Sequence, residues 1–315
     1  MDSRKWAILL AKAAISATLL YLILRHISLE KLSGRLSDAT LQRALLAFLP
    51  LVAVTFCVGF RWHVIASAVA RPVRFLQAWA VSMIGAALDQ VFVTMSGDAY
   101  RIWWLKKGSA SLTHAIAGVL LDRVAGMLGI IFLVMLFMAR FAQLDTQGSL
   151  VWVPLMLSAG MLCGFALLLV LDKAPFSRIR NRWFAGLAVL SASARRVFLT
   201  PGTAGRALAG AILVHVGICT TMTVIAWALG IDLPLAMALT VVPAVFLVSS
   251  LPLSIGGWGV REGAMVLALG LAGIESSDAF LISVTFGILA ALMGLTGGIL
   301  WVAGYPSART LRIKT

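Results

Sequence analysis

Apolar runs, each close to the length of a membrane span, recur along this chain. Residues 44–60, 150–171 and 207–229 contain no Asp, Glu, Lys or Arg. A helix needs about 20 such residues to cross the hydrocarbon core of a bilayer. Hydrophobic residues make up 61% of the chain and charged residues 12%, which leaves no polar stretch long enough for a soluble domain. We therefore predict an all-α, polytopic membrane protein with one integral membrane domain over residues 1–315.

The pattern contains about seven or eight hydrophobic segments, which we interpret as about six full transmembrane helices and two broken or re-entrant helical hairpins. The full spans are expected at residues 6–24, 44–60, 112–139, 150–171, 207–229 and 279–302. Residues 61–74 are expected to form a basic loop. Residues 75–95 either re-enter or span fully. Residues 233–274 contain a Pro/Gly break, and their second half rises only roughly 18 Å, too little to cross the membrane.

Basic residues gather in the short segments between the apolar runs. The net charge is +14, and this distribution follows the positive-inside rule rather than indicating nucleic acid as a partner. Residues 172–206 form the most basic connector, so we place it in the cytoplasm, with residues 183–198 as a candidate interfacial helix. This scheme predicts that both termini are cytoplasmic, and we expect the membrane to be a bacterial inner membrane. The basic connector 25–43 conflicts with this scheme, which places it outside.

The same topology makes residues 75–95 and 233–274 each return to the side that they left. Two interrupted elements that enter from opposite faces are typical of transporters built from inverted repeats. An inverted repeat is therefore one interpretation of this chain. The similarity between the two regions at the level of residues is too small to establish it.

The most distinctive motif is LPLSIGGWGVREG at residues 251–263. Its expected helix-break and turn residues are Pro252, Gly256, Gly257 and Gly259. Backbone amides at such a break attract anions, and Arg261 has the planar fork that suits a phosphate. Glu262 is expected to pair with an arginine elsewhere in the chain. The alternative is a tight interhelical turn with a local ion pair.

Two further charged groups interrupt the apolar pattern. Gly97 marks a turn before Asp98 and Arg101, whose spacing places them on one helical face. Asp122 and Arg123 lie within an expected span and point about 100° apart, so they need different partners. A charge at membrane depth costs roughly 2.5–3.5 kcal/mol, which favours a functional cluster, although a helix cap and a structural ion pair are the alternatives. Asp89 either lines the cavity or caps a break.

Signatures of enzymes are missing from the sequence. It contains no metal-binding HExxH motif, no P-loop, no nucleophile elbow and no carboxylate cluster for a metal. The three cysteines lie in apolar runs without ligand-type spacing. We therefore expect no catalytic residues, no metal and no cofactor.

These motifs resemble those of a known family, the membrane region of lysylphosphatidylglycerol synthases, which is also described as flippase-like. LPLSIGGWGVRE is close to the family pattern Pro-x-Ser-x-Gly-Gly-x-Gly-x-Arg-Glu, and MSGDAYR and LLDRVAGM resemble two further elements. Asp98 and Asp122 stand where the family usually has glutamate. The resemblance covers nearly the whole chain. It implies a domain that binds or moves an anionic lipid. Because little sequence follows the last expected span, we expect no soluble domain that transfers an amino acid.

The resemblance and the motifs together predict a flippase-like protein that translocates a phospholipid or a polyprenyl phosphate. The residues expected to bind its headgroup are Arg261, Glu262, Asp98, Arg101, Asp122 and Arg123. The arginines are expected to contact the anion, while the carboxylates hold them in place. Two alternatives stay open: a membrane enzyme or accessory subunit of lipid or glycan synthesis, and a structural partner of a separately encoded soluble synthase.

Overall fold

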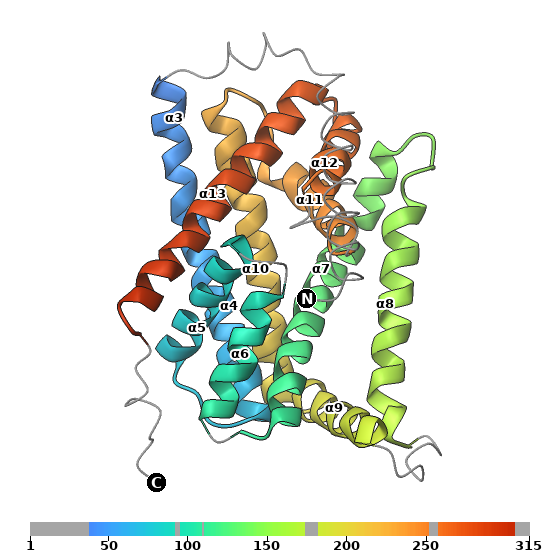
Figure 1. Ribbon diagram of the computed structural model, residues 1–315. Helices are drawn as coiled ribbons and strands as arrows, with labels where there is room; N and C mark the ends of the chain where they lie inside the picture. Colours follow the sequence, from blue (N-terminus) through green and yellow to red (C-terminus); the bar gives the residue numbers. More distant parts are fainter. Residues whose placement is uncertain (1–37, 92–94, 109, 174–181, 252–257, 306–315) are drawn as a thin grey trace, which may run out of the picture. The chain divides into compact units, whose positions relative to one another are not determined.

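The structure is a computed structural model, and it describes residues 38–91, 95–108, 110–173, 182–251 and 258–305. Within these residues every regular element is a helix and no strand occurs. In chain order (Figure 1) the elements are α3 (Asp38–Ala44), η1 (Leu45–Ala47), α4 (Phe48–Val69), α5 (Phe75–Val91), α6 (Ser96–Lys107), α7 (Leu112–Leu144), α8 (Trp152–Val170), η2 (Leu171–Lys173), α9 (Arg182–Phe198), α10 (Pro201–Ala228), α11 (Leu235–Ser249), α12 (Val260–Gly270) and α13 (Ser276–Val302). The all-α prediction is confirmed.

Five helical stretches among the described residues are long and apolar enough to cross a membrane. They are Gln42–Val69, Leu112–Leu144, Trp152–Lys173, Pro201–Ala228 and Ser276–Val302. Each overlaps one of the expected full spans. The sixth expected span, residues 6–24, lies outside the described residues. The protein is therefore a polytopic helical membrane protein, as the sequence predicts.

The expected basic loop at residues 61–74 is wrong over most of its length. Helix α4 continues through this segment to Val69, and only residues 70–74 connect it to α5. No glycine or proline interrupts residues 60–71, so nothing in the backbone stops the helix before Pro72. Arg61 consequently lies inside a membrane-length helix, where its side chain is only 11% exposed.

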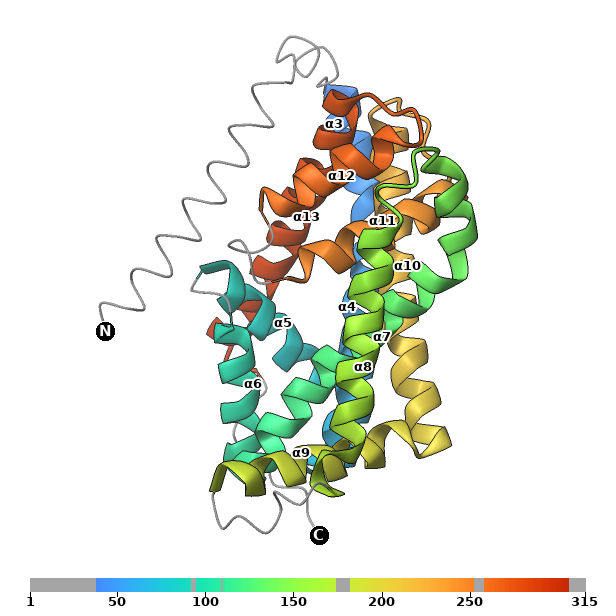
Figure 2. The same cartoon turned by 90° about the vertical axis from the view of Figure 1, so that its right-hand side faces the viewer.

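Two pairs of short helices occupy the regions where broken hairpins are expected. In the first pair α5 packs beside α6, and Figures 1 and 2 both place these helices side by side. In the second pair α11 packs against α12. Residues 75–95 are therefore not one continuous helix, because α5 ends at Val91 and α6 begins at Ser96.

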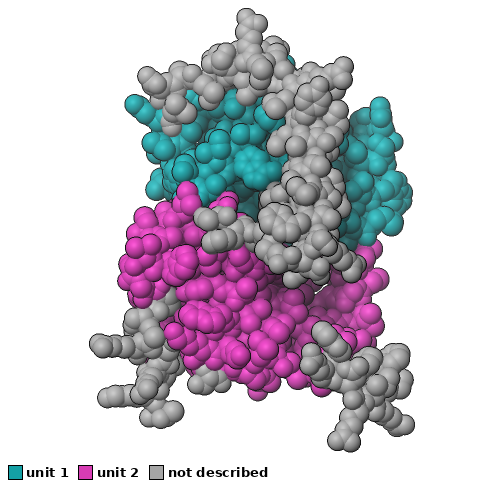
Figure 3. Space-filling model, in the orientation of Figure 1, with its two compact units in different colours: residues 1–52, 130–157, 215–292 teal, residues 53–129, 158–214, 293–315 magenta. Residues whose placement is uncertain are grey.

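The chain divides into two compact units, coloured separately in Figure 3. Unit 1 comprises residues 1–52, 130–157 and 215–292, and unit 2 comprises residues 53–129, 158–214 and 293–315. The boundaries fall within the five long helical stretches, so each of these contributes residues to both units. Each unit holds one pair of short helices: α11 and α12 belong to unit 1, and α5 and α6 to unit 2.

Glycines hold the first pair of short helices at unusually short range. A methyl group added at Gly97 of α6 would clash with the carbonyl oxygen of Gly85 in α5. The other side of α5 meets Gly297 of α13, where an added methyl group would clash with the backbone of Met83. Small residues allow helix backbones to approach closely in membrane proteins. Here they fix α6, and the charged residues at its start, against α5.

Helix α9 forms where the sequence predicts an interfacial helix. It runs across the adjoining parts of α8 and α10 (Figures 1 and 2). Arg195 of α9 holds Asp172 with both terminal nitrogens, and Ser191 donates a further hydrogen bond to the same carboxylate at 3.0 Å. These contacts attach α9 to the end of α8. Its position at a membrane surface stays a prediction.

Candidate functional site

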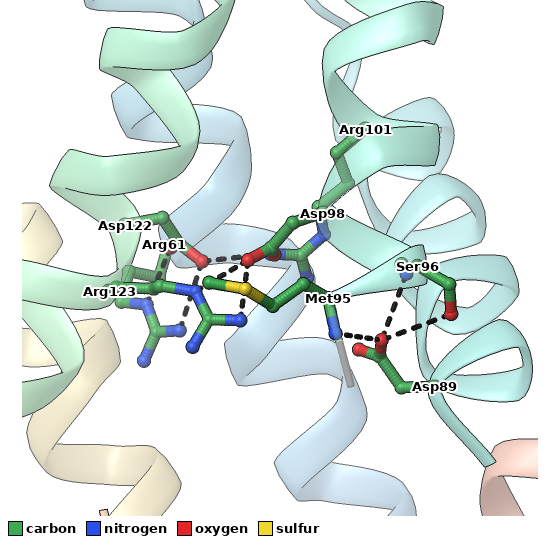
Figure 4. Close-up of polar contacts among 9 residues, drawn as sticks. Arg61, Asp89, Met95, Ser96, Asp98, Arg101, Asp122 and Arg123 are labelled. Carbon is green, nitrogen blue, oxygen red and sulfur yellow. Dashed lines mark hydrogen bonds and ion pairs between the residues drawn. The ribbon is translucent and has the colours of Figure 1, made fainter. Parts of the chain in front are cut away.

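Asp122 of α7 receives two arginines from two other helices (Figure 4). Arg61 of α4 donates from Nε to Oδ1 at 2.7 Å and from Nη2 to Oδ2 at 3.2 Å. Arg101 of α6 donates from Nη1 to Oδ2 at 3.1 Å. Two-pronged contacts between guanidinium and carboxylate groups are among the stronger hydrogen bonds in proteins. The Asp122 side chain is 2% exposed, so these arginines replace the water that a carboxylate would otherwise need.

The neighbouring Arg123 points to a different partner, as its position one residue further along the helix requires. Its Nε and Nη2 both lie 2.5 Å from Oδ2 of Asp98 in α6. Asp98 and Arg101 thus lie on one face of α6, and that face meets α7. The Arg123 side chain is 41% exposed, whereas that of Asp98 is 16% exposed. Arg123 is therefore the most accessible of the arginines joined by these contacts.

We call these five residues, Arg61, Asp98, Arg101, Asp122 and Arg123, the arginine–aspartate cluster. It joins α4, α6 and α7 through three guanidinium groups and two carboxylates, so it carries one positive charge more than negative charges. Arg101 also lies over the ring of Trp62, with its central carbon 5.1 Å from the ring centre. Aromatic faces attract cations, which helps to hold this guanidinium within the helices.

Asp89 caps the start of α6, which settles the two roles that the sequence leaves open for it. Its Oδ1 accepts hydrogen bonds from the backbone N–H groups of Met95 at 3.1 Å and Gly97 at 2.9 Å, and from the Ser96 hydroxyl at 3.4 Å. The first amides of a helix lack partners within the helix, so a carboxylate here stabilises the break. Met95 adopts a φ of 89°, the only left-handed non-glycine residue among those described.

The second motif forms a separate, compact group within unit 1. Arg261 donates from Nη2 to Oε1 of Glu262 at 2.6 Å and from Nε to the same oxygen at 3.0 Å. Ser283 of α13 donates to this oxygen at 3.1 Å. The other carboxylate oxygen accepts the N–H of Gly259 at 2.6 Å. Gly259, at φ 86°, is the N-cap of α12, so Glu262 satisfies the first amide of its own helix.

The Arg261 guanidinium lies between two aromatic rings. Its central carbon is 4.9 Å from the ring centre of Trp258 and 5.7 Å from that of Phe286. A methyl group added at Gly287 would clash with Arg261 and the Trp258 ring, so glycine at this position gives the arginine its space. The Arg261 guanidinium is held tightly by these neighbours, and the Arg261 side chain is 9% exposed.

The structure corrects one expected contact and adds two residues. Glu262 does not pair with a distant arginine but with the adjacent Arg261, while its other carboxylate oxygen accepts the N–H of Gly259. Arg61 and Ser283 belong to these groups although the sequence analysis missed them. The uninterrupted helix-forming residues after Arg61 were the signal that it lies within a span. A lone serine in an apolar run gives no comparable signal.

Some of the remaining expected site residues are described by the structure and others lie outside the described residues. Each expected carboxylate lies against an arginine, and Gly97 and Gly259 both lie at helix starts. Pro252, Gly256 and Gly257 lie outside the described residues. The arginine–aspartate cluster belongs to unit 2 and the Arg261 group to unit 1. Their convergence on one ligand stays a prediction.

The described residues contain no group of three or more His, Cys, Asp or Glu side chains that could hold a metal ion. The carboxylates of the two charged groups are instead occupied by arginines, a serine and one backbone amide. This chemistry suits the binding of an anion by guanidinium groups rather than the binding of a metal by carboxylates.

Comparison with protein families shows the family of this chain. The model of the family described as lysylphosphatidylglycerol synthase TM region matches residues 9–298. The chain belongs to this family. No curated protein and no solved structure matches it in the corresponding comparisons. Both charged groups fall within the part of the chain that matches the lysylphosphatidylglycerol synthase TM region.

Proposed function

We propose that this chain is a flippase-like membrane protein that binds an anionic lipid, of phospholipid or polyprenyl-phosphate type, and moves it across a bacterial inner membrane. One observation carries the proposal: three arginines and two aspartates from three helices converge in the arginine–aspartate cluster. Membership of a family of membrane domains supports the same class of function.

The charges of the cluster favour an anionic ligand. Burying charged groups is expensive even when they are paired, so such groups are rarely retained within apolar helices without a role. The positive excess of the cluster matches a phosphate that carries one negative charge. Arg123 is the group placed to meet such a headgroup first, because its side chain is 41% exposed. Arg101 lies behind it at 12% exposure.

The short helices supply the second part of the argument. Helix α6 has 12 residues and α12 has 11, so they rise roughly 18 and 16 Å against a hydrocarbon core of about 30 Å. Non-helical backbone at membrane depth is tolerated where protein or water lines it. We interpret both pairs as re-entrant hairpins whose second helices begin at a polar site. Each of these helices carries an arginine in its first two turns.

Headgroup reorientation in proteoliposomes tests this proposal. A fluorescent phosphatidylglycerol in vesicles is exposed to an impermeant reducing agent, and the rate at which the inner pool becomes accessible is measured. We expect Arg123→Ala and Arg101→Ala to slow this rate by at least about tenfold, the effect of losing one charge-assisted hydrogen bond. Arg140→Ala is the matched control, because Arg140 is an exposed arginine on the same helix as Arg123.

Two results would contradict the proposal. One is a wild-type rate no higher than that of protein-free vesicles. The other is an unchanged rate in both arginine variants. Extracting the lipid after the assay separates transport from catalysis: a phosphatidylglycerol that has been chemically altered would favour the membrane enzyme.

A further inference from the structure

A second arginine-centred group lies at the other end of α6, away from the arginine–aspartate cluster. Arg71 belongs to the short connector between α4 and α5, and its guanidinium carbon lies 4.4 Å from the ring centre of Trp104. Gly108, which ends α6, faces the same guanidinium so closely that an added methyl group would clash with it. We call Arg71, Trp104 and Gly108 the Arg71 site.

Arg71 is buried in part without the partners that a buried guanidinium needs. Its Nε and Nη2 are buried and have no hydrogen-bond partner. Trp104, only 2% exposed, also has an unpaired ring N–H. Burial lowers the pKa of the Arg71 guanidinium, because desolvation disfavours its charged form. Unpaired buried donors are rare in folded proteins, and each calls for an explanation.

The surrounding sequence supplies positive charge and no carboxylate. No Asp or Glu occurs in residues 62–88 or 99–121, whereas Lys106 and Lys107 occupy the last turn of α6. None of the ion pairs in the described part of the chain involves Arg71. Within that part, the Arg71 Nη1 neither makes a hydrogen bond nor belongs to the buried unpaired atoms, which leaves it the accessible nitrogen of the group.

Exposed apolar residues close in sequence to this site indicate a membrane interface rather than open water. Trp103 is 52% exposed, Leu76 57% and Leu112 48%. The Lys107 ammonium lies 4.9 Å from the ring centre of Trp103. Tryptophan beside lysine at a helix end is typical of the headgroup level of a bilayer. At this level of a bilayer the phosphate of a lipid headgroup is the oxyanion closest to the site.

We propose that the Arg71 site binds the phosphate of an anionic phospholipid, separately from the arginine–aspartate cluster. The phosphate lies against Nη1 and supplies the counter-charge that the protein lacks. The Trp104 ring and Gly108 hold the guanidinium in place. Lys106 and Lys107 add attraction at longer range, and the exposed tryptophan and leucines contact the lipid beyond its headgroup.

Lipid titration of the purified, delipidated protein, followed by native mass spectrometry, tests this site. The probes are phosphatidylglycerol, phosphatidylcholine as a zwitterionic comparison, and inorganic phosphate. We expect Arg71→Ala to lose one phosphatidylglycerol site, or at least about tenfold in its affinity, because a charge-assisted contact is removed. Arg74→Ala is the matched control, since Arg74 is an exposed arginine of the same connector.

Gly108→Ala tests the position of the Arg71 charge, because this variant retains the guanidinium group but displaces it. Its methyl group displaces the end of a flexible side chain rather than backbone, so the protein is expected to fold. We expect this variant to lose the same site although it retains Arg71. Thermal unfolding checks that each variant is folded, and Gly108→Ala keeps the test decisive if Arg71→Ala does not fold.

Three results would overturn the proposal: unchanged phosphatidylglycerol binding in both variants, an equal loss in Arg74→Ala, or equal losses for phosphatidylglycerol and phosphatidylcholine. Inorganic phosphate distinguishes the two sources of the oxyanion. Binding of phosphate alone, with no lipid retained at the site, would assign it to a soluble anion and contradict the lipid assignment. Headgroup reorientation is a separate measurement, so either proposal can fail without the other.

Discussion

Replacing Asp122 by asparagine removes the one negative charge that two buried arginines share. Arg61 and Arg101 are 11% and 12% exposed, and the ion pairs that both make with α7 end on this carboxylate. The amide keeps one acceptor oxygen but presents an NH2 group to a guanidinium N–H, so at least one hydrogen bond is lost. Removing one partner of a buried ion pair costs about 3–5 kcal/mol. We expect a loss of stability of this size.

Asp98→Asn is the matched control for this effect. Its partner Arg123 is 41% exposed, and in the polar site that we propose water replaces the lost contact. A pair of this kind contributes about 0–1 kcal/mol. The two substitutions remove the same chemical group from one cluster and differ in the number and the burial of the arginines that lose their counter-charge.

Equilibrium unfolding in mixed detergent and sodium dodecyl sulfate micelles, followed by circular dichroism, measures the free energy of unfolding of both variants. The expected order is wild type, then Asp98→Asn close to it, then Asp122→Asn clearly below. An Asp122→Asn variant no less stable than Asp98→Asn would refute the reasoning. It would show that Arg61 and Arg101 do not depend on Asp122 for compensation of their charge.

Three further substitutions test the helix starts and the second charged group. Asp89→Ala is expected to cost about 0.5–2 kcal/mol, the range for a lost helix cap, in the same unfolding assay. Gly97→Ala is expected to cost about 1–3 kcal/mol through its clash with Gly85, whereas alanine at Gly186, which has open space, is expected to cost nothing. Glu262→Gln leaves a buried arginine without its counter-charge, so we expect about 3 kcal/mol or more to be lost; an unfolding midpoint equal to wild type would contradict this.

Most of the fold follows from hydropathy, because apolar length alone identifies a membrane helix. The ends of the helices follow less well, and α4 is the clearest case. The charge of Arg61 marked the predicted end of the span, but arginine is a good helix former and its ion pair with Asp122 compensates the charge, so the helix continues. The compensating group, Asp122, lies 61 residues away in the sequence, and no local sequence pattern indicates that Arg61 pairs with it.

The charged groups were predictable as residues but not as contacts. The angle between Asp122 and Arg123 correctly required two different partners, because helix geometry fixes it. Which arginine serves which carboxylate depends on how α6 packs against α7, and the sequence does not specify that packing. Glu262 shows the opposite case: its arginine partner is the adjacent residue, and its other oxygen accepts the N–H of the left-handed Gly259.

The two arginines on Asp122 are not held equally. Arg61 makes two hydrogen bonds to the carboxylate, whereas Arg101 makes one. A competing oxyanion therefore detaches Arg101 more easily, and the carboxylate that it leaves behind still has a cation beside it. Helix α4 then stays fastened to α7, whereas α6 keeps Asp98–Arg123 as its ion pair with that helix. Under the function that we propose, ligand capture therefore weakens the attachment of one helix and leaves that of the other intact.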